Sequence, residues 1–140
     1  MKTSTARVLA VLFAALLVSC GPMVRVALVG TPEVDSVIGK LELEKAEGDL
    51  VLLTAVLKEL PSPEKVHPDA TRFLAWITGP SGEPRILGVV ERDPVKREGR
   101  IGATIADRTF LFQVTAEGEE TPDEPSPHVV VRRQVTAENE

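Results

Sequence analysis

The chain has 140 residues, of which 43% are hydrophobic and 26% are charged, a composition typical of one globular domain and not of a disordered chain. Its single cysteine excludes a framework of internal disulfides, and its two histidines leave few ligands for a metal site. The formal net charge of −5 argues against a nucleic-acid partner, because phosphate binding relies on a cationic surface. The composition therefore indicates a small, acidic, globular protein.

The first 19 residues have the pattern of a secretory signal. Residues 1–7 carry two basic side chains and no acid, and residues 8–19 carry no charge. A membrane-spanning helix needs about 20 apolar residues. The uncharged run here is shorter, and Gly21-Pro22 follows it. The pattern therefore predicts an N-terminal signal helix over residues 1–19 and argues against a transmembrane anchor.

The uncharged run ends in Leu17-Val18-Ser19-Cys20. This tetrapeptide resembles the bacterial lipobox, in which a small residue precedes a cysteine that is lipidated and becomes the first residue of the mature chain. The resemblance implies cleavage between Ser19 and Cys20, and a thioether-linked lipid with acyl chains such as palmitate on Cys20. The alternative is that Cys20 is an ordinary apolar residue at the end of a signal that is cleaved nearby.

A lipid on Cys20 predicts a location in the bacterial cell envelope. Two or three acyl chains give stable anchoring, so the polypeptide itself needs no membrane-binding face. Gly21, at the second mature position, differs from the Asp that in enteric bacteria resembles an inner-membrane retention signal, and it favours the outer membrane in a Gram-negative organism. We expect a signal peptide at 1–19, a lipidated tether at 20–22 and one domain at 23–140. Loss of the two cations before Ser19 would take the net charge from −5 to −7.

Short strands are expected throughout the domain, because apolar and polar residues alternate with period two in several segments. Three of these segments alternate strictly: Lys40–Lys45, Arg100–Ile105 and Thr109–Ala116. Two are apolar on both faces, as central strands are: Arg72–Thr78 and Arg85–Glu91. Two valine-rich segments are expected to open and close the fold: Met23–Val29 and Val129–Val135.

The segment Asp49–Leu60 is ambiguous. Four of its leucines have helical spacing, but it is equally a β-rich run between Gly48 and Pro61. We favour a strand, since a helix here would interrupt a series of strands.

The connections between these segments are rich in Gly, Pro and charge. Gly79–Gly82 and Ala106–Arg108 are expected hairpin turns, and Glu91–Gly99 and Glu117–His128 are expected charged loops. Seven or eight strands with turns about every ten residues predict an all-β fold, an immunoglobulin-like antiparallel β-sandwich.

A family resemblance runs over about residues 49–127. It is carried by Leu60-Pro61, the stretch from Thr71 to Trp76, Gly82, Leu87-Gly88, the stretch from Phe112 to Glu117, and Pro122 and Pro125. These motifs resemble the extracytoplasmic C-terminal domain of anti-sigma-K-type factors, and the resemblance implies a β-sandwich in the envelope. The family's sigma-binding segment and membrane helix have no counterpart here, where a lipobox stands instead, so sigma-factor binding is not implied.

The expected structural core is aromatic. Trp76, the only tryptophan, is in phase with Leu74 and is expected to fill the space between the sheets together with Phe73, Phe110 and Phe112. The alternative role for Trp76 is a platform on which a sugar or peptide ligand stacks.

No catalytic, metal or cofactor site is expected from the remaining residues. His67 and His128 flank prolines, have no nucleophile in a recognisable pattern and are expected to be exposed loop histidines. The acids Glu117, Glu119, Glu120, Asp123 and Glu124 lack the pattern of a calcium loop and are expected in a solvated loop. The basic residues Lys96, Arg97, Arg100 and Arg132-Arg133 could contact anionic headgroups or glycan.

The sequence thus predicts a membrane-anchored envelope lipoprotein with a non-enzymatic structural or protein-interaction domain. An envelope protein is the possible partner, and nucleic acid is not. One alternative is an accessory or regulatory subunit of an envelope complex, and another is a small ligand or carbohydrate binder.

Overall fold

The structure is a computed structural model that describes residues 24–137. Nine strands account for most of this part of the chain, together with one 3₁₀ turn and one short helix. In chain order the elements are β1 (Val24–Val29), η1 (Pro32–Val34), β2 (Ile38–Lys45), β3 (Val51–Lys58), α1 (Pro63–Val66), β4 (Arg72–Thr78), β5 (Pro84–Val89), β6 (Glu91–Asp93), β7 (Glu98–Ile105), β8 (Thr109–Glu117) and β9 (Val129–Thr136).

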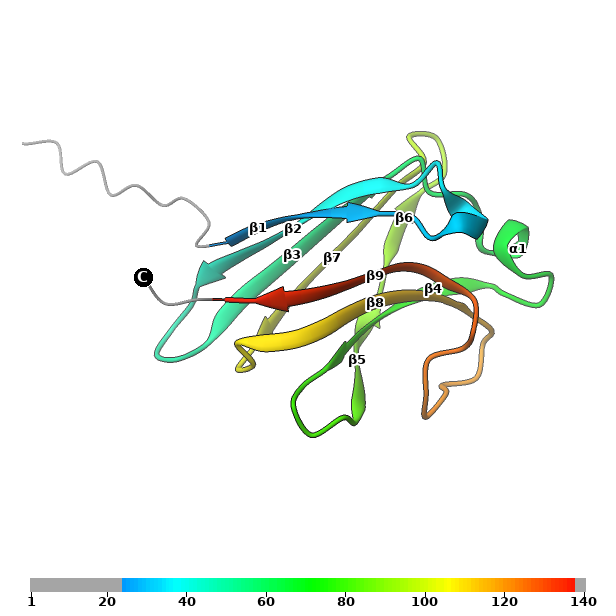
Figure 1. The fold of residues 1–140 in the computed structure, drawn as a ribbon. Helices are drawn as coiled ribbons and strands as arrows, with labels where there is room; N and C mark the ends of the chain where they lie inside the picture. Colours follow the sequence, from blue (N-terminus) through cyan, green and yellow to red (C-terminus); the bar gives the residue numbers. More distant parts are fainter. Residues whose placement is uncertain (1–23, 138–140) are drawn as a thin grey trace, which may run out of the picture.

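The strands form two antiparallel sheets that pack face to face (Figure 1). The first sheet has the order β1-β2-β3-β7-β6, and the second has the order β5-β4-β8-β9. The expected all-β fold is confirmed, with nine strands in the described residues where seven or eight were expected.

Period-two alternation places the apolar side chains of the first sheet. On β2, Leu41 and Leu43 are fully buried, while the charged residues between and beside them point the other way. The ambiguous segment Asp49–Leu60 is confirmed as a strand, β3, paired along its whole length with β2. Tertiary pairing on both sides outweighs the helical spacing of its leucines.

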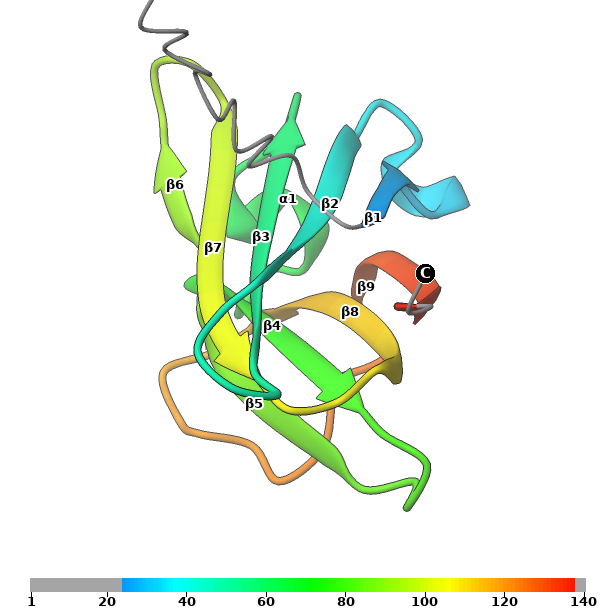
Figure 2. The ribbon, with the colours of Figure 1, turned by 90° about the vertical axis from the view of Figure 1, so that its left-hand side faces the viewer.

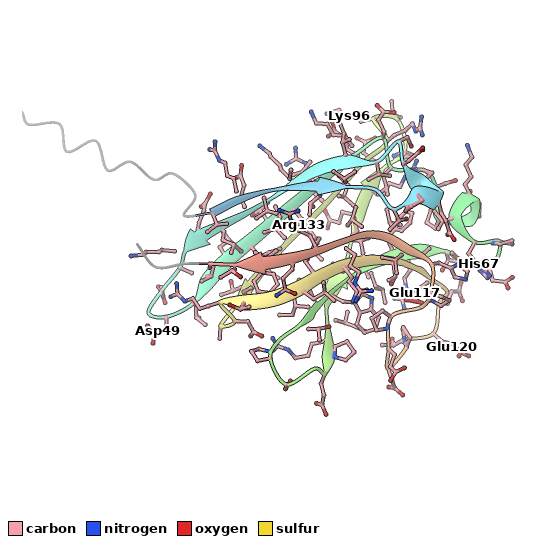
Figure 3. All side chains as sticks on the ribbon, viewed as in Figure 1. Asp49, His67, Lys96, Glu117, Glu120 and Arg133 are labelled. Carbon is pink, nitrogen blue, oxygen red and sulfur yellow. The ribbon has the colours of Figure 1, made fainter. Side chains whose placement is uncertain are left out.

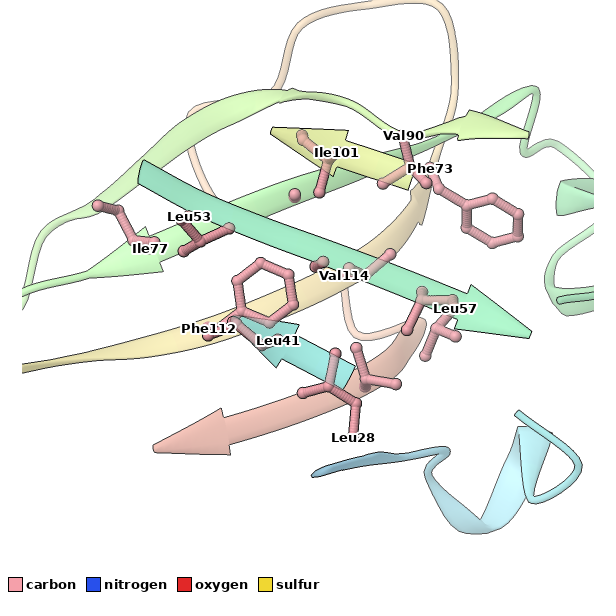
Figure 4. Packing of buried hydrophobic residues seen from close by; sticks show 14 of the residues in the cluster. Leu28, Leu41, Leu53, Leu57, Phe73, Ile77, Val90, Ile101, Phe112 and Val114 are labelled. Carbon is pink, nitrogen blue, oxygen red and sulfur yellow. The ribbon is translucent and has the colours of Figure 1, made fainter. Parts of the chain in front are cut away.

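One apolar cluster fills the space between the sheets (Figure 4). It takes Leu41, Leu53 and Leu57 from the first sheet, and Phe112 and Val114 from the second. Phe73 and Phe110 belong to the same cluster, and both are about 1% exposed. Burial of these side chains is the main stabilising contribution in such a fold.

One side of the sandwich is closed by a chain segment that passes from sheet to sheet (Figure 2). The backbone N–H of Val90 donates to the carbonyl of Phe73, and the strands on either side of Val90, β5 and β6, belong to different sheets. The prediction of a central strand at Arg85–Glu91 is therefore wrong, since β5 is an edge strand in which two of the six residues are exposed and none is buried. The expected loop Glu91–Gly99 is wrong as well, because β6 and the start of β7 form a hairpin there.

The opposite side is closed where β1 meets β9. Gly30 forms a bridge with Val131, and Thr31 donates both its backbone N–H, to Val130, and its hydroxyl, to Val129. A Cβ at Gly30 would collide with the carbonyl oxygen of Val34, so the close turn into η1 requires glycine there. Both open edges of the sandwich are thereby partly covered, which limits pairing with foreign strands.

The two ends of the sandwich differ. The β2–β3 hairpin lies at the end where β1 begins, whereas η1, α1, the β6–β7 hairpin and the segment 118–128 lie at the opposite end (Figure 1). We call these the β1-start end and the loop end.

The cluster predicts a large penalty for truncation at Phe112. Phe112→Ala should lower the free energy of unfolding by about 3–5 kcal/mol, because it leaves a cavity between the sheets. Urea unfolding followed by the fluorescence of Trp76 measures this. Val95→Ala, at a side chain that is 90% exposed, is the control and should change stability by less than about 0.5 kcal/mol. A Phe112→Ala protein as stable as the control would contradict the assigned core.

Candidate functional site

The predicted lipidation site lies outside the described residues. Ser19 and Cys20 precede Val24, the first residue that the structure describes. The candidate site within the fold therefore has to come from other residues.

Trp76 is fully buried, but not between the sheets. Its neighbours in β4, Phe73, Ala75 and Ile77, belong to the cluster between the sheets, whereas Trp76 and Leu74 do not. Because successive side chains of a strand point to opposite faces, Trp76 lies on the outer face of the second sheet. The expectation that it fills the space between the sheets is wrong, since the phase it shares with Leu74 is the outward one.

The segment 118–128 explains how an outward tryptophan can be buried. This segment lies on the side of the second sheet that faces away from the first sheet (Figures 1 and 2). Trp76 and Leu74 are only 1% and 2% exposed. The loop predicted to be solvated thus packs as a cover over the outer face of β4 and β8.

A chain of hydrogen bonds joins the tryptophan to the cover. The indole Nε1–H of Trp76 donates to Thr115 Oγ1 at 2.9 Å, and the Thr115 hydroxyl donates to Glu117 Oε2 at 2.7 Å. The same carboxylate oxygen accepts the backbone N–H of Ser126 at 3.0 Å. Glu117 is only 7% exposed, so its carboxylate has lost most of its hydration. The two donors compensate for that loss.

Arg72 holds the beginning of the cover. Its Nε donates to the carbonyl of Gly118 at 2.9 Å, and its Nη2 donates to the carbonyls of Glu119 and Glu120, each at 3.2 Å. An arginine fork that binds three successive carbonyls fixes the direction of the chain. The exit from β8 is therefore set by a side chain of the neighbouring strand.

Ser126 holds the end of the cover. Its hydroxyl donates to the carbonyl of Ala116 at 2.9 Å and accepts the backbone N–H of His128 at 3.2 Å. The hydroxyl is thus committed to the backbone and does not bond a histidine ring. It lacks the base that would make it a nucleophile.

His67 and His128 come together at the loop end. Their ring centroids are 4.0 Å apart with an angle of 30° between the planes, and both side chains are half-buried. His67 and Glu117 lie at the same end of the molecule in Figure 3, at a shallow hollow that Asp69, Ser126 and His128 also line. Nδ1 of His67 accepts the backbone N–H of Asp69 at 3.3 Å. The expectation of exposed loop histidines is wrong, since the two rings form a half-buried, tilted pair between α1 and the cover.

The acidic tract divides into two parts. Glu119, Glu120, Asp123 and Glu124 are exposed, as expected for a solvated loop. Glu117 differs, because it is the last residue of β8 and lies under the cover. Among residues 24–137, no group of three His, Cys, Asp or Glu side chains is placed to hold a metal ion.

The basic cluster expected near the β6–β7 hairpin is balanced by acids. Lys96 and Arg100 line a shallow depression together with Glu91, Asp93 and Glu98, and Arg97 makes an ion pair with Glu59 at 3.5 Å. Arg132 and Arg133 are exposed on the edge strand β9, where charge discourages pairing with another strand.

Sequence reasoning missed Arg72, Thr115, Glu117 and Ser126. Gln113, Thr115 and Glu117 point outward on β8 and are polar, which normally indicates a solvent-facing side. The available signal was the proline content of 118–128, since a proline-rich loop loses little entropy when it is ordered on a surface.

Comparison with protein-family models, with curated proteins and with solved structures finds no match to this chain. In the part of the chain that the structure describes, no helix is long and apolar enough to cross a bilayer.

The hydrogen-bond chain predicts that Thr115 stabilises the cover. Thr115→Val should cost about 1–3 kcal/mol, because it leaves the indole N–H and the carboxylate of Glu117 short of a buried partner. Urea unfolding gives the cost, and a red shift of the Trp76 emission reports water entry. The matched control is Thr104→Val at an exposed position of β7. Equal stability and equal emission of the two variants would show that the hydrogen-bond chain does not contribute to the free energy of unfolding.

The β6–β7 turn predicts an acid-sensitive contact. The backbone N–H of Lys96, and then that of Val95, donate to Asp93 and lower its pKa below the ordinary 3.8. A lowered pKa in the folded state stabilises the turn above pH 3.8, and this contribution is lost as the pH falls through the folded value. Carboxyl ¹³C NMR titration should give a lower midpoint for Asp93 in the folded chain than in the urea-unfolded chain. Identical midpoints would rule out the contact in solution.

Proposed function

We propose that this protein is a lipid-anchored lipoprotein of the bacterial envelope whose immunoglobulin-like domain has a structural or protein-interaction role and is not an enzyme. The observation that carries the proposal is the position of the only cysteine. Cys20 directly follows the uncharged residues 8–19 of the predicted signal and lies four residues before the first strand, which begins at Val24.

The strand order supports an immunoglobulin-like topology. Immunoglobulin domains have sheets ordered ABED and GFC, with C′ added beyond C in some of them. The order β2-β3-β7-β6 corresponds to ABED, and the order β9-β8-β4-β5 corresponds to GFCC′. Two features depart from the pattern: β1 is an additional edge strand, and the tryptophan of β4, the strand in position C, lies on the outer face.

The proposed anchor at Cys20 orients the domain relative to the bilayer. Four residues reach at most about 14 Å. A lipid on Cys20 therefore keeps the β1-start end close to the bilayer and points the loop end away from it. The loop end carries the cover, the histidine pair and Val95, which is 90% exposed on its hairpin. We propose this end as the part available to an envelope partner.

The geometry of the polar groups supports binding or structure over catalysis. The hydroxyl of Ser126 is committed to backbone atoms, and the carboxylate of Glu117 is held by Thr115 and Ser126. A catalytic group needs a free partner within hydrogen-bond reach. These side chains instead fix the cover on the sheet.

Replacement of the cysteine tests the anchor. Wild-type protein extracted from membranes should carry the mass of a lipidated Cys20 and lack residues 1–19, because thioether formation needs the thiol. Cys20→Ser should keep its signal peptide, carry no acyl mass and lose the lipid-dependent partition into detergent. Intact-mass spectrometry and detergent partition measure this, and in a Gram-negative host density fractionation should place the wild type in the outer membrane.

Acyl mass missing from the wild type would contradict the proposal. In the same strains, a photo-crosslinking residue at Val95 should give an adduct of defined mass in the wild type, whereas one at Asp49, at the β1-start end, should not (Figure 3). Equal labelling from both positions would contradict the assignment of the loop end as the contact surface.

A further inference from the structure

The two histidines of the chain form a contact between the end of the cover and the turn that follows α1. Their ring centroids are 4.0 Å apart, and both side chains are half-buried. His67 comes directly after α1, and His128 is the last residue of the segment 118–128. The ring pair thus joins two segments that are far apart in the sequence, at the loop end where Figure 3 shows His67.

Both histidines are also held through their backbones. The N–H of His128 donates to Ser126 Oγ, and its carbonyl accepts the N–H of Ala116 on β8. The N–H of His67 donates to the carbonyl of Pro63 in α1. A displacement of His128 therefore acts on the same serine that holds the end of the cover.

A proton on each ring would bring two positive charges together. In the part of the chain that the structure describes, no carboxylate makes an ion pair with either imidazole. An imidazolium at one position therefore has no counter-ion at contact distance, and it would face the other imidazolium across 4.0 Å. Nδ1 of His67 accepts the backbone N–H of Asp69, so a proton taken up on this nitrogen also ends that hydrogen bond.

The other charged groups around the pair offer little compensation. Asp69 and Glu117 line the same hollow, but Asp69 is exposed to water, and Glu117 Oε2 is already held by Thr115 and Ser126. The guanidinium of Arg72 on β4 is bound to carbonyls of the cover and adds another positive charge. The remaining charged side chains of α1 and the cover are exposed, where solvent screens them: Glu64, Lys65, Glu119, Glu120, Asp123 and Glu124.

We propose that the histidine pair makes the cover acid-sensitive. A histidine side chain gains its positive charge between about pH 8 and pH 5. When both rings are charged, their repulsion in a half-buried site separates them and loosens the end of the cover above Trp76 and Leu74. The loosened state takes up the second proton more readily, so the closed state is favoured at neutral pH and the loosened state in acid. This inference does not depend on the anchor at Cys20.

Quenching of Trp76 fluorescence measures the state of the cover. Trp76 is the only tryptophan and is 1% exposed, so acrylamide should reach it only when the cover loosens. In the purified full-length protein, the quenching constant should rise several-fold between about pH 8 and about pH 5, while circular dichroism keeps its β-sheet signal. A proton NMR cross-peak between the two imidazole rings should be present at the higher pH and absent at the lower one.

Replacement of either ring should remove this response. His67→Gln and His128→Gln, each made singly, should give quenching that does not change over this pH range, since one charged ring has no like-charged neighbour. The chain has two histidines only, and the ordinary pKa values of other side-chain types lie outside this range. Asp69→Asn is the matched control. It keeps both rings and should keep the rise in quenching.

Three results would overturn the inference. Quenching of the wild type that is equal at both pH values would show that the rings do not control the cover. A rise of the same size in either glutamine variant would assign the response to another group. Loss of the β-sheet signal of the wild type in acid would show general unfolding in place of a local opening.

Discussion

Burial of apolar side chains between the two sheets is the interaction on which the rest of this structure depends. Every strand of both sheets except the short β6 contributes to, or packs against, one cluster that includes Leu41, Leu53, Phe73 and Phe112. The alternation of each strand determines which residues enter this cluster, and it therefore also determines which residues point outward. The position of Trp76 and the polar network beneath the cover are both consequences of that division.

The second sheet is unusual because its outer face is buried as well. β4 and β8 have apolar or hydrogen-bonded residues on both faces, and the segment 118–128 covers them. Arg72 and Ser126 attach this cover at its two ends. The carboxylate of Glu117 then lies among donors in a site with little water, where loss of one partner costs more than the bond itself contributes. The cover is thus part of the folded domain and not an appendage.

The first sheet leaves its outer face open. Its alternating charges include ion pairs such as Lys40–Glu42, which contribute little to stability at an exposed site.

The sequence by itself determined the all-β class, most strand positions and the identity of the buried phenylalanines, because period-two alternation depends on neighbouring residues alone. It also contained the lipobox-like Leu17-Val18-Ser19-Cys20, which is a local motif. Only the tertiary structure decided that Trp76 lies on the outer face, that Glu117 is buried, and that the ring of His67 lies against that of His128. These facts depend on where the segment 118–128 folds back. They join residues up to 61 positions apart, and a pattern read along the chain carries no information about which face a distant loop will cover.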